Sequence, residues 1–337
     1  MTRQIMPWHQ PAWHQWLTQL NAGQGPSLRL GHAYLLSSPV GMGASHLLQA
    51  MGQSLLCQSP GPNGAPCQQC AQCHQFVHAT HPDWHPLTPL ADKKVITVDA
   101  VRQFSERLFQ KTHQGGRKVG VIEPAEAMNE AAFNALLKTL EEPPAQTVML
   151  LLTHAPSRLP ATLVSRCRLW TLAVPTREQA LTWLTQACAD TDQAKVKKAL
   201  AVNWGAPLQA QAWLQAKADV FEAQWQQDLQ QLAGQKQPVG PTVEQWLKQA
   251  ELPEILDYFY WWTVQRVRAA VYQNKLAMNP HWLVFQQSLL YAKSQAQTQI
   301  NAAILLESVV VDWLALADES FVPSLGLQPP WQNRVMG

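Results

Sequence analysis

The sequence predicts a parallel α/β domain followed by a part made of helices only. Short apolar runs of strand length alternate with amphipathic helical patterns between residues 31 and 172. Strands buried on both faces of a parallel sheet have such continuous apolar sequences. From Arg177 to Asp318 the pattern is helical and contains no strand. The 337 residues suffice for two or three domains, at about 100–200 residues each.

Each element follows from the local pattern: strands where apolar residues run together, and helices where they recur every three or four positions. The expected strands are Gly31–Ser38, Val95–Val98, Arg117–Glu123, Thr147–Thr153 and Arg168–Leu172. The expected helices are Ala12–Ala22, Ala44–Leu56, one that begins with Asp99 as N-cap, Asn129–Leu140 and Ser157–Val164. Residues 57–90 have no regular period, Gly234–Pro241 is expected to be a loop, and the chain after Phe321 is expected to be irregular.

The composition excludes several classes of protein. Lys and Arg number 25 against 23 Asp and Glu, and only 14% of residues are charged. A strongly basic nucleic-acid binder and a charge-rich disordered chain are therefore excluded. No export segment and no apolar run of membrane-spanning length occurs. We therefore expect a cytoplasmic protein without membrane contact, in which the six cysteines bind metal or stay reduced.

Four cysteines form a compact motif in the irregular stretch. Cys57, Cys67, Cys70 and Cys73 have the spacing C-x9-C-x2-C-x2-C. Four thiolates fill the tetrahedral shell of Zn²⁺ and leave no position for water, so we predict a structural zinc site. Reduced surface thiols and a redox disulfide pair are the alternatives. Nearby histidines could replace a cysteine, but we expect them to be ordinary loop residues: His74, His78, His81 and His85.

The turn Pro39–Gly43 lies where a phosphate-binding loop belongs, between a strand and a helix. Such a loop reads G-x-x-x-x-G-K-[ST], and its lysine neutralises the nucleotide's phosphates. Here Ser38 replaces the first glycine and Ala44 replaces the lysine, whereas Gly43 and Ser45 fit; Gly41 is a further glycine of the turn. The sequence therefore predicts a degenerate loop without a functional ATP site.

The acidic end of the central strand is altered as well. An ATPase of this kind ends that strand with Asp-Glu, which serves the metal and the attacking water. This chain has Glu123 followed by Pro124, so the second acid is missing. Glu123 is either near a metal or simply a polar residue at the strand end, and we favour the second interpretation.

Two motifs point to a family. Asn134–Pro144 reads NALLKTLEEPP and Leu163–Cys167 reads LVSRC. Together with the cysteine motif they resemble the bacterial clamp-loader subunits of DNA polymerase III, members of the AAA+ proteins. The resemblance is strong over residues 1–175 and is closest to the delta-prime branch. The gamma/tau branch shares both motifs but keeps the lysine and the Asp-Glu pair. An arginine of active subunits is also absent from Trp204–Leu208.

The resemblance implies an organisation and a role. Residues 1–172 would be an AAA+ α/β domain with a zinc module at 57–73, residues 173–212 a helical lid, and residues 213–337 a helical collar. The chain would be a subunit of a hetero-pentamer with gamma/tau and delta subunits, within the DNA polymerase III holoenzyme. That complex loads the sliding clamp onto primer-template DNA, and this subunit would not hydrolyse ATP itself. A gamma/tau-like ATPase and an unrelated DNA-binding zinc protein are the alternatives.

The resemblance also implies a role for Arg166 in the segment Ser165–Cys167. In AAA+ rings this segment faces the neighbouring subunit, where an arginine finger reaches the neighbour's γ-phosphate. The guanidinium suits this role because it stays charged and its planar fork pairs with phosphate oxygens. The alternative is an ion pair within its own domain, with Glu141 or Glu142. Arg158 and Arg168 fit the motif less well.

In the collar, two apolar stretches are candidates for ring contacts: Tyr258–Trp262 and Leu305–Leu316. The alternative for each of their residues is a place in the core of that domain.

Overall fold

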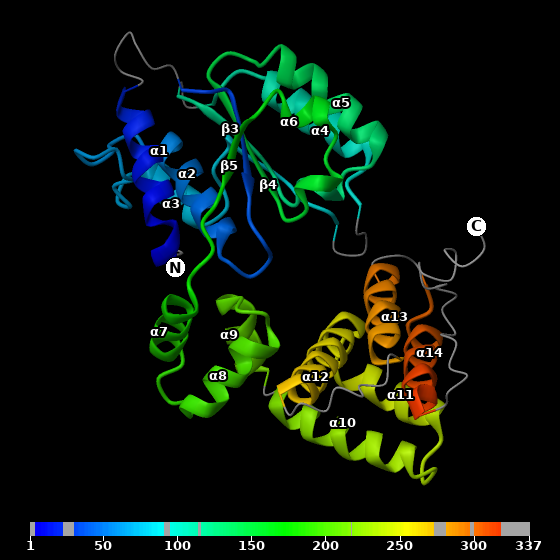
Figure 1. Cartoon of the computed structure of the whole chain (residues 1–337). Helices are drawn as coiled ribbons and strands as arrows, with labels where there is room; N and C mark the ends of the chain where they lie inside the picture. The colour runs from blue at the N-terminus through cyan, green and yellow to red at the C-terminus, as the bar shows by residue number, and fades with distance from the viewer. Residues whose placement is uncertain are drawn as a thin grey trace, which may run out of the picture. The chain divides into compact units, whose positions relative to one another are not determined.

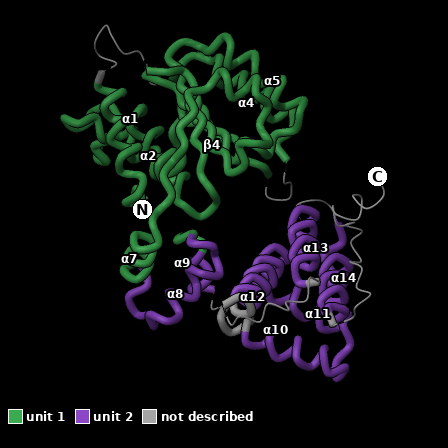
Figure 2. Tube along the Cα trace, viewed as in Figure 1, with its two compact units in different colours: residues 1–186, 206–209 green, residues 187–205, 210–337 purple. Residues whose placement is uncertain are grey.

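The computed structural model has two compact units, which Figure 2 shows in different colours. The first comprises Met1–Gln186 and Ala206–Gln209, and the second comprises Ala187–Gly205 and Ala210–Gly337. The structure describes residues 4–22, 30–90, 95–113, 116–216, 218–272, 281–296 and 300–317. The chain after Phe321, predicted to be irregular, lies outside them. The division at 172 and 212 into three domains stays a prediction.

The first unit contains a five-stranded sheet in which every neighbouring pair is parallel, as predicted (Figure 1). The strand order is β2-β3-β4-β1-β5. The strands are β1 Ala33–Ser37, β2 Trp84–Leu87, β3 Lys118–Ile122, β4 Thr147–Thr153 and β5 Arg168–Thr171. Register places Leu35 of β1 beside Leu151 of β4. All residues of β3 and β4 are buried, which explains the continuous apolar run within β4 and the absence of further charged residues after Lys118 in β3.

Helices cover both faces of the sheet. Leu150 packs with Trp16 and Leu47 on one face, whereas its neighbour Leu151 packs with Phe104 and Leu136 on the other. This alternation along β4 divides the core of the unit into two layers. The helices of this unit are α1 Gln10–Ala22, α2 Ala44–Leu56, α3 Ala71–Val77, α4 Val98–Phe109, α5 Glu130–Glu141, α6 Ala161–Val164 and α7 Arg177–Ala187, with 3-10 turns at Pro7–His9, Ala125–Ala127 and Pro156–Arg158.

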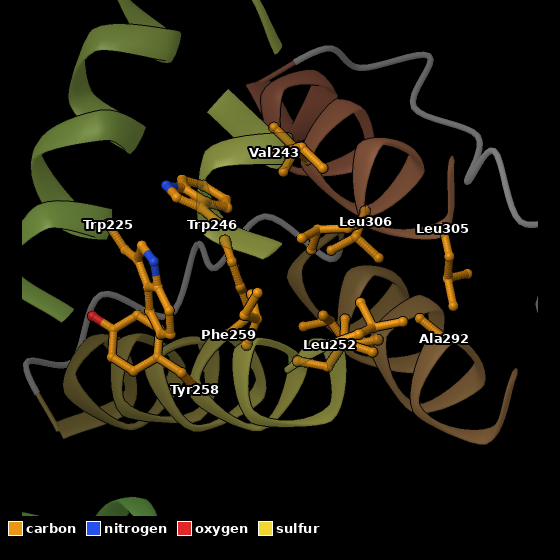
Figure 3. Close-up of a cluster of buried hydrophobic side chains, with 14 of the residues drawn as sticks. Trp225, Val243, Trp246, Leu252, Tyr258, Phe259, Ala292, Leu305 and Leu306 are labelled. Carbon is orange, nitrogen blue, oxygen red and sulfur yellow. The ribbon is translucent and has the colours of Figure 1, made fainter. Parts of the chain in front are cut away.

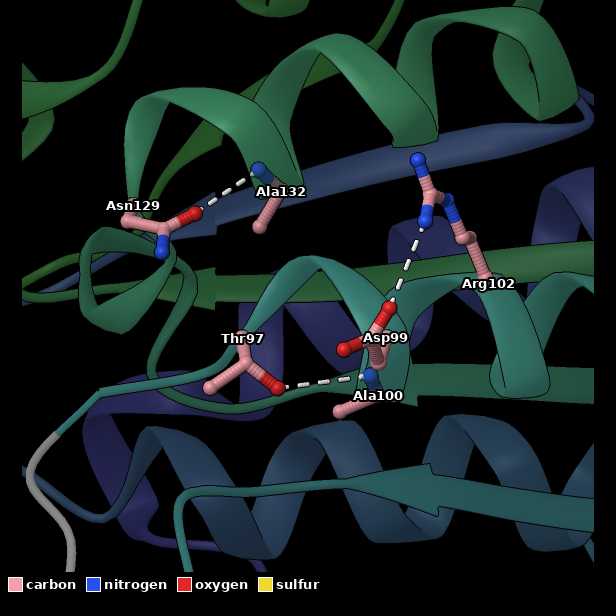
Figure 4. A network of polar contacts seen from close by, with 6 residues as sticks. All are labelled: Thr97, Asp99, Ala100, Arg102, Asn129 and Ala132. Carbon is pink, nitrogen blue, oxygen red and sulfur yellow. Dashed lines mark hydrogen bonds and ion pairs between the residues drawn. The ribbon is translucent and has the colours of Figure 1, made fainter.

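The strand predicted at Val95–Val98 is wrong. Only Ile96 makes a bridge, to Met128, and α4 already begins at Val98. Its N-cap is Thr97 rather than Asp99: the Thr97 hydroxyl accepts from the N–H of Ala100, and Asp99 pairs with Arg102 one turn on (Figure 4). The capping threonine accounts for the shifted helix start. Asp99, in the first turn, still interacts favourably with the helix dipole.

Residues 57–90 contain two elements that the sequence pattern did not predict, α3 and β2. The strand β2 has four residues, lies at an edge of the sheet and includes Pro86, features that weaken a strand signal. The helix predicted at Ser157–Val164 is divided into a 3-10 turn and the four-residue α6. The break falls at Pro160, which cannot donate the hydrogen bond that a continuous helix needs.

The second unit is all helical over the residues that the structure describes. Its helices are α8 Gln193–Val202, most of α9 Pro207–Gln215, α10 Ala218–Ala233, α11 Val239–Gln249, α12 Leu252–Tyr272, α13 His281–Gln295 and α14 Ala302–Leu314, with a 3-10 turn at Ala315–Ala317. The loop predicted at Gly234–Pro241 is too long, because α11 begins at Val239 with Pro238 as its N-cap. Pro241 lies in the first turn of α11, where proline is tolerated because the backbone N–H has no partner within the helix.

Large aromatic side chains fill the core of this unit (Figure 3). Trp225, Trp246, Tyr258 and Phe259 are all buried, and the indole N–H of Trp246 donates to the buried carboxylate of Asp228 at 2.8 Å. Among the helices that the structure describes, none has the length and apolar character needed to cross a membrane.

Candidate functional site

The segment with the predicted arginine finger follows α6. Backbone hydrogen bonds from Arg166 to Leu163 at 3.1 Å and from Cys167 to Val164 at 3.2 Å continue the turn of this short helix. The hydroxyl of Ser165 donates to the Thr162 carbonyl at 3.1 Å. Cys167 packs against the core, and burial raises the pKa of its thiol to about 12. A neutral, inward-facing Cys167 thus anchors the segment, and Arg166 is left nearer the surface.

Arg166 makes two contacts inside its own unit. One guanidinium nitrogen, Nη1, donates to the Thr162 carbonyl at 2.8 Å, and Nη2 pairs with Oε1 of Glu141 at 2.5 Å. The Arg166 side chain is 34% exposed and that of Glu141 is 52% exposed. Half-exposed pairs of this kind contribute about 0–1 kcal/mol to stability. The Glu141 pair therefore contributes little to stability, and the partly exposed Arg166 remains accessible to a second anion.

The degenerate phosphate loop lies between β1 and α2, as predicted. Gly41 and Gly43 have positive φ angles of 77° and 82°, the left-handed conformation that glycine adopts without strain. A Cβ on Gly43 would lie 2.5 Å from Cγ of Met6. A Cβ on Gly41 would lie 2.7 Å from Cγ of Gln209. The chain's own side chains thus press closely on both glycines.

Further contacts hold the loop from both sides. The indole N–H of Trp8 donates to the Met42 carbonyl at 2.8 Å, and the N–H of Leu208 donates to the Gly41 carbonyl at 3.1 Å. Ala44, at the lysine position, is buried. Trp8 and Leu208 are far from the loop in sequence and belong to no motif, so no local signal could have revealed these contacts.

The residues that would share a metal ion in an ATPase contact each other directly. The hydroxyl of Ser45 donates to the carboxylate of Glu123. Nδ1 of His154 lies 2.8 Å from the Ser38 carbonyl, and the N–H of His154 donates to Glu126 at 2.9 Å. Glu123 thus has a partner in the first turn of α2, an outcome that the sequence interpretation as a plain strand-end residue did not include.

The four cysteines of the motif come together in space. Their Sγ atoms all lie within 4.8 Å of one another. Cys57 and Cys67 have their Sγ atoms 3.5 Å apart, and Cys57 and Cys70 have theirs 3.9 Å apart. Four thiolates at about 2.3 Å from one zinc ion, arranged as a tetrahedron, would be about 3.8 Å apart. The cluster is therefore of the right size to hold one metal ion.

Backbone N–H groups point at these sulfur atoms. Cys67 donates to the Sγ of Cys57 at 3.3 Å, Cys70 to that of Cys67 at 3.3 Å, and Cys73 to that of Cys70 at 3.4 Å. Burial raises the pKa of the Cys57 and Cys73 thiols. Burial acts in the same direction on Cys70, but there the N–H groups of Cys73 and Gln58 and the thiols of Cys67 and Cys73 outweigh burial and bring the pKa to about 6. Such donors favour the thiolate, which is the form that binds metal.

None of the four nearby histidines belongs to this metal-sized group, among the residues that the structure describes. His78 instead has its Nδ1 2.8 Å from the His74 carbonyl, and His81 is buried beside Asp83.

The fold and these sites define a class: an α/β protein with a turn at the phosphate-loop position, no lysine in that turn and an inserted cysteine module. The family model described as "DNA polymerase III, delta subunit" matches residues 12–176. DNA polymerase III subunit delta' of Pseudomonas aeruginosa is 34% identical over 93% of this chain and 98% of that protein. The chain belongs to the DNA polymerase III subunit delta' family.

Two further relatives match over a shorter region. The subunit delta' of Haemophilus influenzae is 40% identical over 63% of this chain and 62% of that protein. The subunit delta' of Escherichia coli is 40% identical over 62% of this chain and 60% of that protein. The chain thus matches less than two thirds of the length of these two relatives.

Proposed function

We propose that this chain is the non-hydrolysing delta-prime subunit of a bacterial clamp loader. It assembles with gamma/tau and delta subunits into a hetero-pentamer that loads the sliding clamp onto primer-template DNA, as part of the DNA polymerase III holoenzyme. The observation that carries the proposal is the relationship to the Pseudomonas aeruginosa subunit along almost the whole of both chains. Co-purification with those subunits, and clamp loading with and without this chain, tests it. Equal loading without the chain would refute it.

The subunit has no ATP site of its own in this proposal. The missing lysine at Ala44, the Met6 side chain against Gly43 and the Ser45–Glu123 contact support it. The isolated chain should give no heat of ATP binding in calorimetry. Ala44→Lys should not create an ATPase either, because the loop stays packed and the second acid is still absent. Micromolar ATP affinity of the unaltered chain would contradict this part.

The cysteine cluster holds one structural Zn²⁺ in this proposal. The sulfur spacing and the N–H groups aimed at the thiolates support this role, and four thiolates leave no open position for catalysis. Bound zinc would supply a cross-link between Cys57 and the segment before α3. Protein purified without added zinc should contain one zinc per chain, and Cys70→Ser should lower that content. Reduced, folded protein without zinc would contradict the assignment.

Arg166 acts in trans, as an arginine finger at the neighbouring subunit's ATP. Its place after α6 and its partial exposure support this role. Arg166→Ala should leave the fold, zinc content and assembly intact, but should lower the clamp- and DNA-stimulated ATPase of the reconstituted loader. Arg166→Lys should restore little, because a point charge lacks the fork geometry. Arg102→Ala is a matched control, since Arg102 also has an exposed carboxylate partner.

Residues 213–337 supply the ring contacts in this proposal. Tyr258, Phe259 and Leu305 are buried and fill the core of the unit, as the alternative interpretation had it. Ile304 and Val311, in contrast, are exposed on α14 and are candidates for contacts with a neighbour. The double change to Glu at these two positions should weaken assembly without unfolding the unit. Deletion of residues 213–337 should abolish assembly, and retained co-purification would count against this role.

A further inference from the structure

The carboxylate of Glu141 lies where it can orient the guanidinium of Arg166. Nη2 of Arg166 pairs with Glu141 at 2.5 Å, and Nη1 donates to the Thr162 carbonyl at 2.8 Å. The two partners belong to different elements, α5 and α6. Two contacts from separate elements fix both the position and the plane of a guanidinium, which one contact cannot do.

The place of Glu141 in its helix supports a role beyond local stability. Glu141 is the last residue of α5, and Glu142 follows it as the C-cap. The carbonyl groups at a helix C-terminus disfavour negative charge and favour cations. A carboxylate here is therefore unfavourable for the helix itself, and the positive charge of Arg166 offsets it.

The pairing does not use up the donors of Arg166. A guanidinium has five N–H groups, and the two contacts with Glu141 and Thr162 use one each. The others remain for an incoming phosphate group. Arg166 can therefore approach a phosphate without giving up either partner, and the carboxylate need not be displaced.

We infer that Glu141 is a positioning residue for Arg166, an inference that rests on the proposed trans role of that arginine. Glu141 and the Thr162 carbonyl hold the guanidinium in one orientation before the neighbour's nucleoside triphosphate is reached. A free arginine side chain would lose its rotamer freedom at that step. With Arg166 ordered in advance, this entropy is not lost when the guanidinium meets the charge of the departing phosphoryl group.

The test uses the loader reconstituted with Glu141→Ala, with Glu142→Ala as the matched control one residue further on. Glu141→Ala should lower kcat for clamp- and DNA-stimulated ATP hydrolysis by about 3- to 10-fold at the affected interface. KM for ATP should stay unchanged, because the nucleotide is bound by the neighbour. Glu141→Gln, which keeps an acceptor without the charge, should retain an intermediate rate. Glu142→Ala should behave as the unaltered loader.

The double variant Glu141→Ala with Arg166→Ala separates positioning from an independent effect. It should be no slower than Arg166→Ala alone, because Glu141 acts only through Arg166. Losses that multiply would overturn the inference, as would an unchanged or faster Glu141→Ala loader beside a slow Arg166→Ala loader. A normal Arg166→Ala loader would instead refute the proposed trans role itself. Unchanged assembly and melting temperature of each variant exclude misfolding as the cause.

Discussion

Gly52 is a helical glycine at which alanine should destabilise the protein. Gly52 is buried in the last part of α2, and a Cβ there would lie 2.1 Å from Cζ3 and 2.8 Å from Cη2 of Trp84. Carbon atoms in contact are normally about 3.5–4.0 Å apart. The indole ring must therefore move by more than 1 Å, roughly the shortfall from contact distance.

The magnitude follows from two opposing effects. Alanine in place of glycine within a helix stabilises by about 1 kcal/mol, whereas overpacking a core costs about 1–3 kcal/mol. Because the overlap with Trp84 is large, we expect a net loss of about 1–2 kcal/mol in the free energy of unfolding. For a unit of this size, the melting temperature should fall by about 2–8 °C.

Gly240→Ala is the matched control, with an effect of opposite sign. Gly240 is also helical, but the nearest atom to its Cβ would be Oε1 of Glu307 at an ordinary 3.4 Å. This change should be neutral or stabilise α11 by up to about 1 kcal/mol. Urea unfolding followed by circular dichroism measures both variants.

Gly52→Ala should also loosen the cysteine module. The Trp84 ring packs edge-on against Phe76 of α3, with ring centroids 4.8 Å apart, and α3 carries Cys73. Faster transfer of zinc to a chelator would report the shift of Trp84. A Gly52→Ala protein as stable as the unaltered one, or more stable, would refute the reasoning.

Three further changes have expected outcomes. Burial lowers the pKa of His9 to about 4, so the folded state takes up fewer protons than the unfolded chain, whose His pKa is about 6.5. The contribution of His9 to stability should fall as the pH drops from 6.5 to 4, by at most about 3 kcal/mol. His9→Phe should reduce the difference in stability between pH 7 and pH 5 in urea unfolding, and the remainder is due in part to His81 and His85, whose pKa values burial also lowers. Asp228→Ala leaves the buried N–H of Trp246 unpaired and should cost about 1–3 kcal/mol, whereas Asp228→Asn, which keeps an acceptor, should cost less. Lys118→Met removes the ammonium that donates to two carbonyls at the end of α4 and should lower the free energy of unfolding by a similar amount, about 1–3 kcal/mol. Equal urea midpoints for the Lys118→Met variant and the unaltered protein would contradict this expectation.

The elements with a strong local signal could be predicted from the sequence. The bounds of α2 and β4 agree with the prediction because an apolar run or period is sharply bounded there. The strand predicted at Val95–Val98 failed because β-branched residues also precede a helix when one of them, Thr97, is its cap. The strand β2 could not be predicted, since its pairing with β3 depends on residues far along the chain.

The candidate site residues also differ in whether the local sequence reveals them. The cysteine spacing and the Ser165–Cys167 motif are short patterns, readable without a structure. Glu141 could be named only as one of two candidate partners for Arg166, because a sequence does not show which of two adjacent carboxylates faces α6. The contact of Met6 with the phosphate loop has no sequence signal at all.

The packing around the phosphate loop has an evolutionary consequence. Met6 fills the space beside Gly43, Ala44 is buried and Ser45 is engaged by Glu123. A mutation that introduces a lysine at Ala44 alone meets this packing and brings no benefit that selection could retain. Mutations that only clear the space expose apolar surface and are disfavoured for stability. A functional phosphate loop therefore requires several changes at once, and the proposed role without ATP hydrolysis is stable against single mutations.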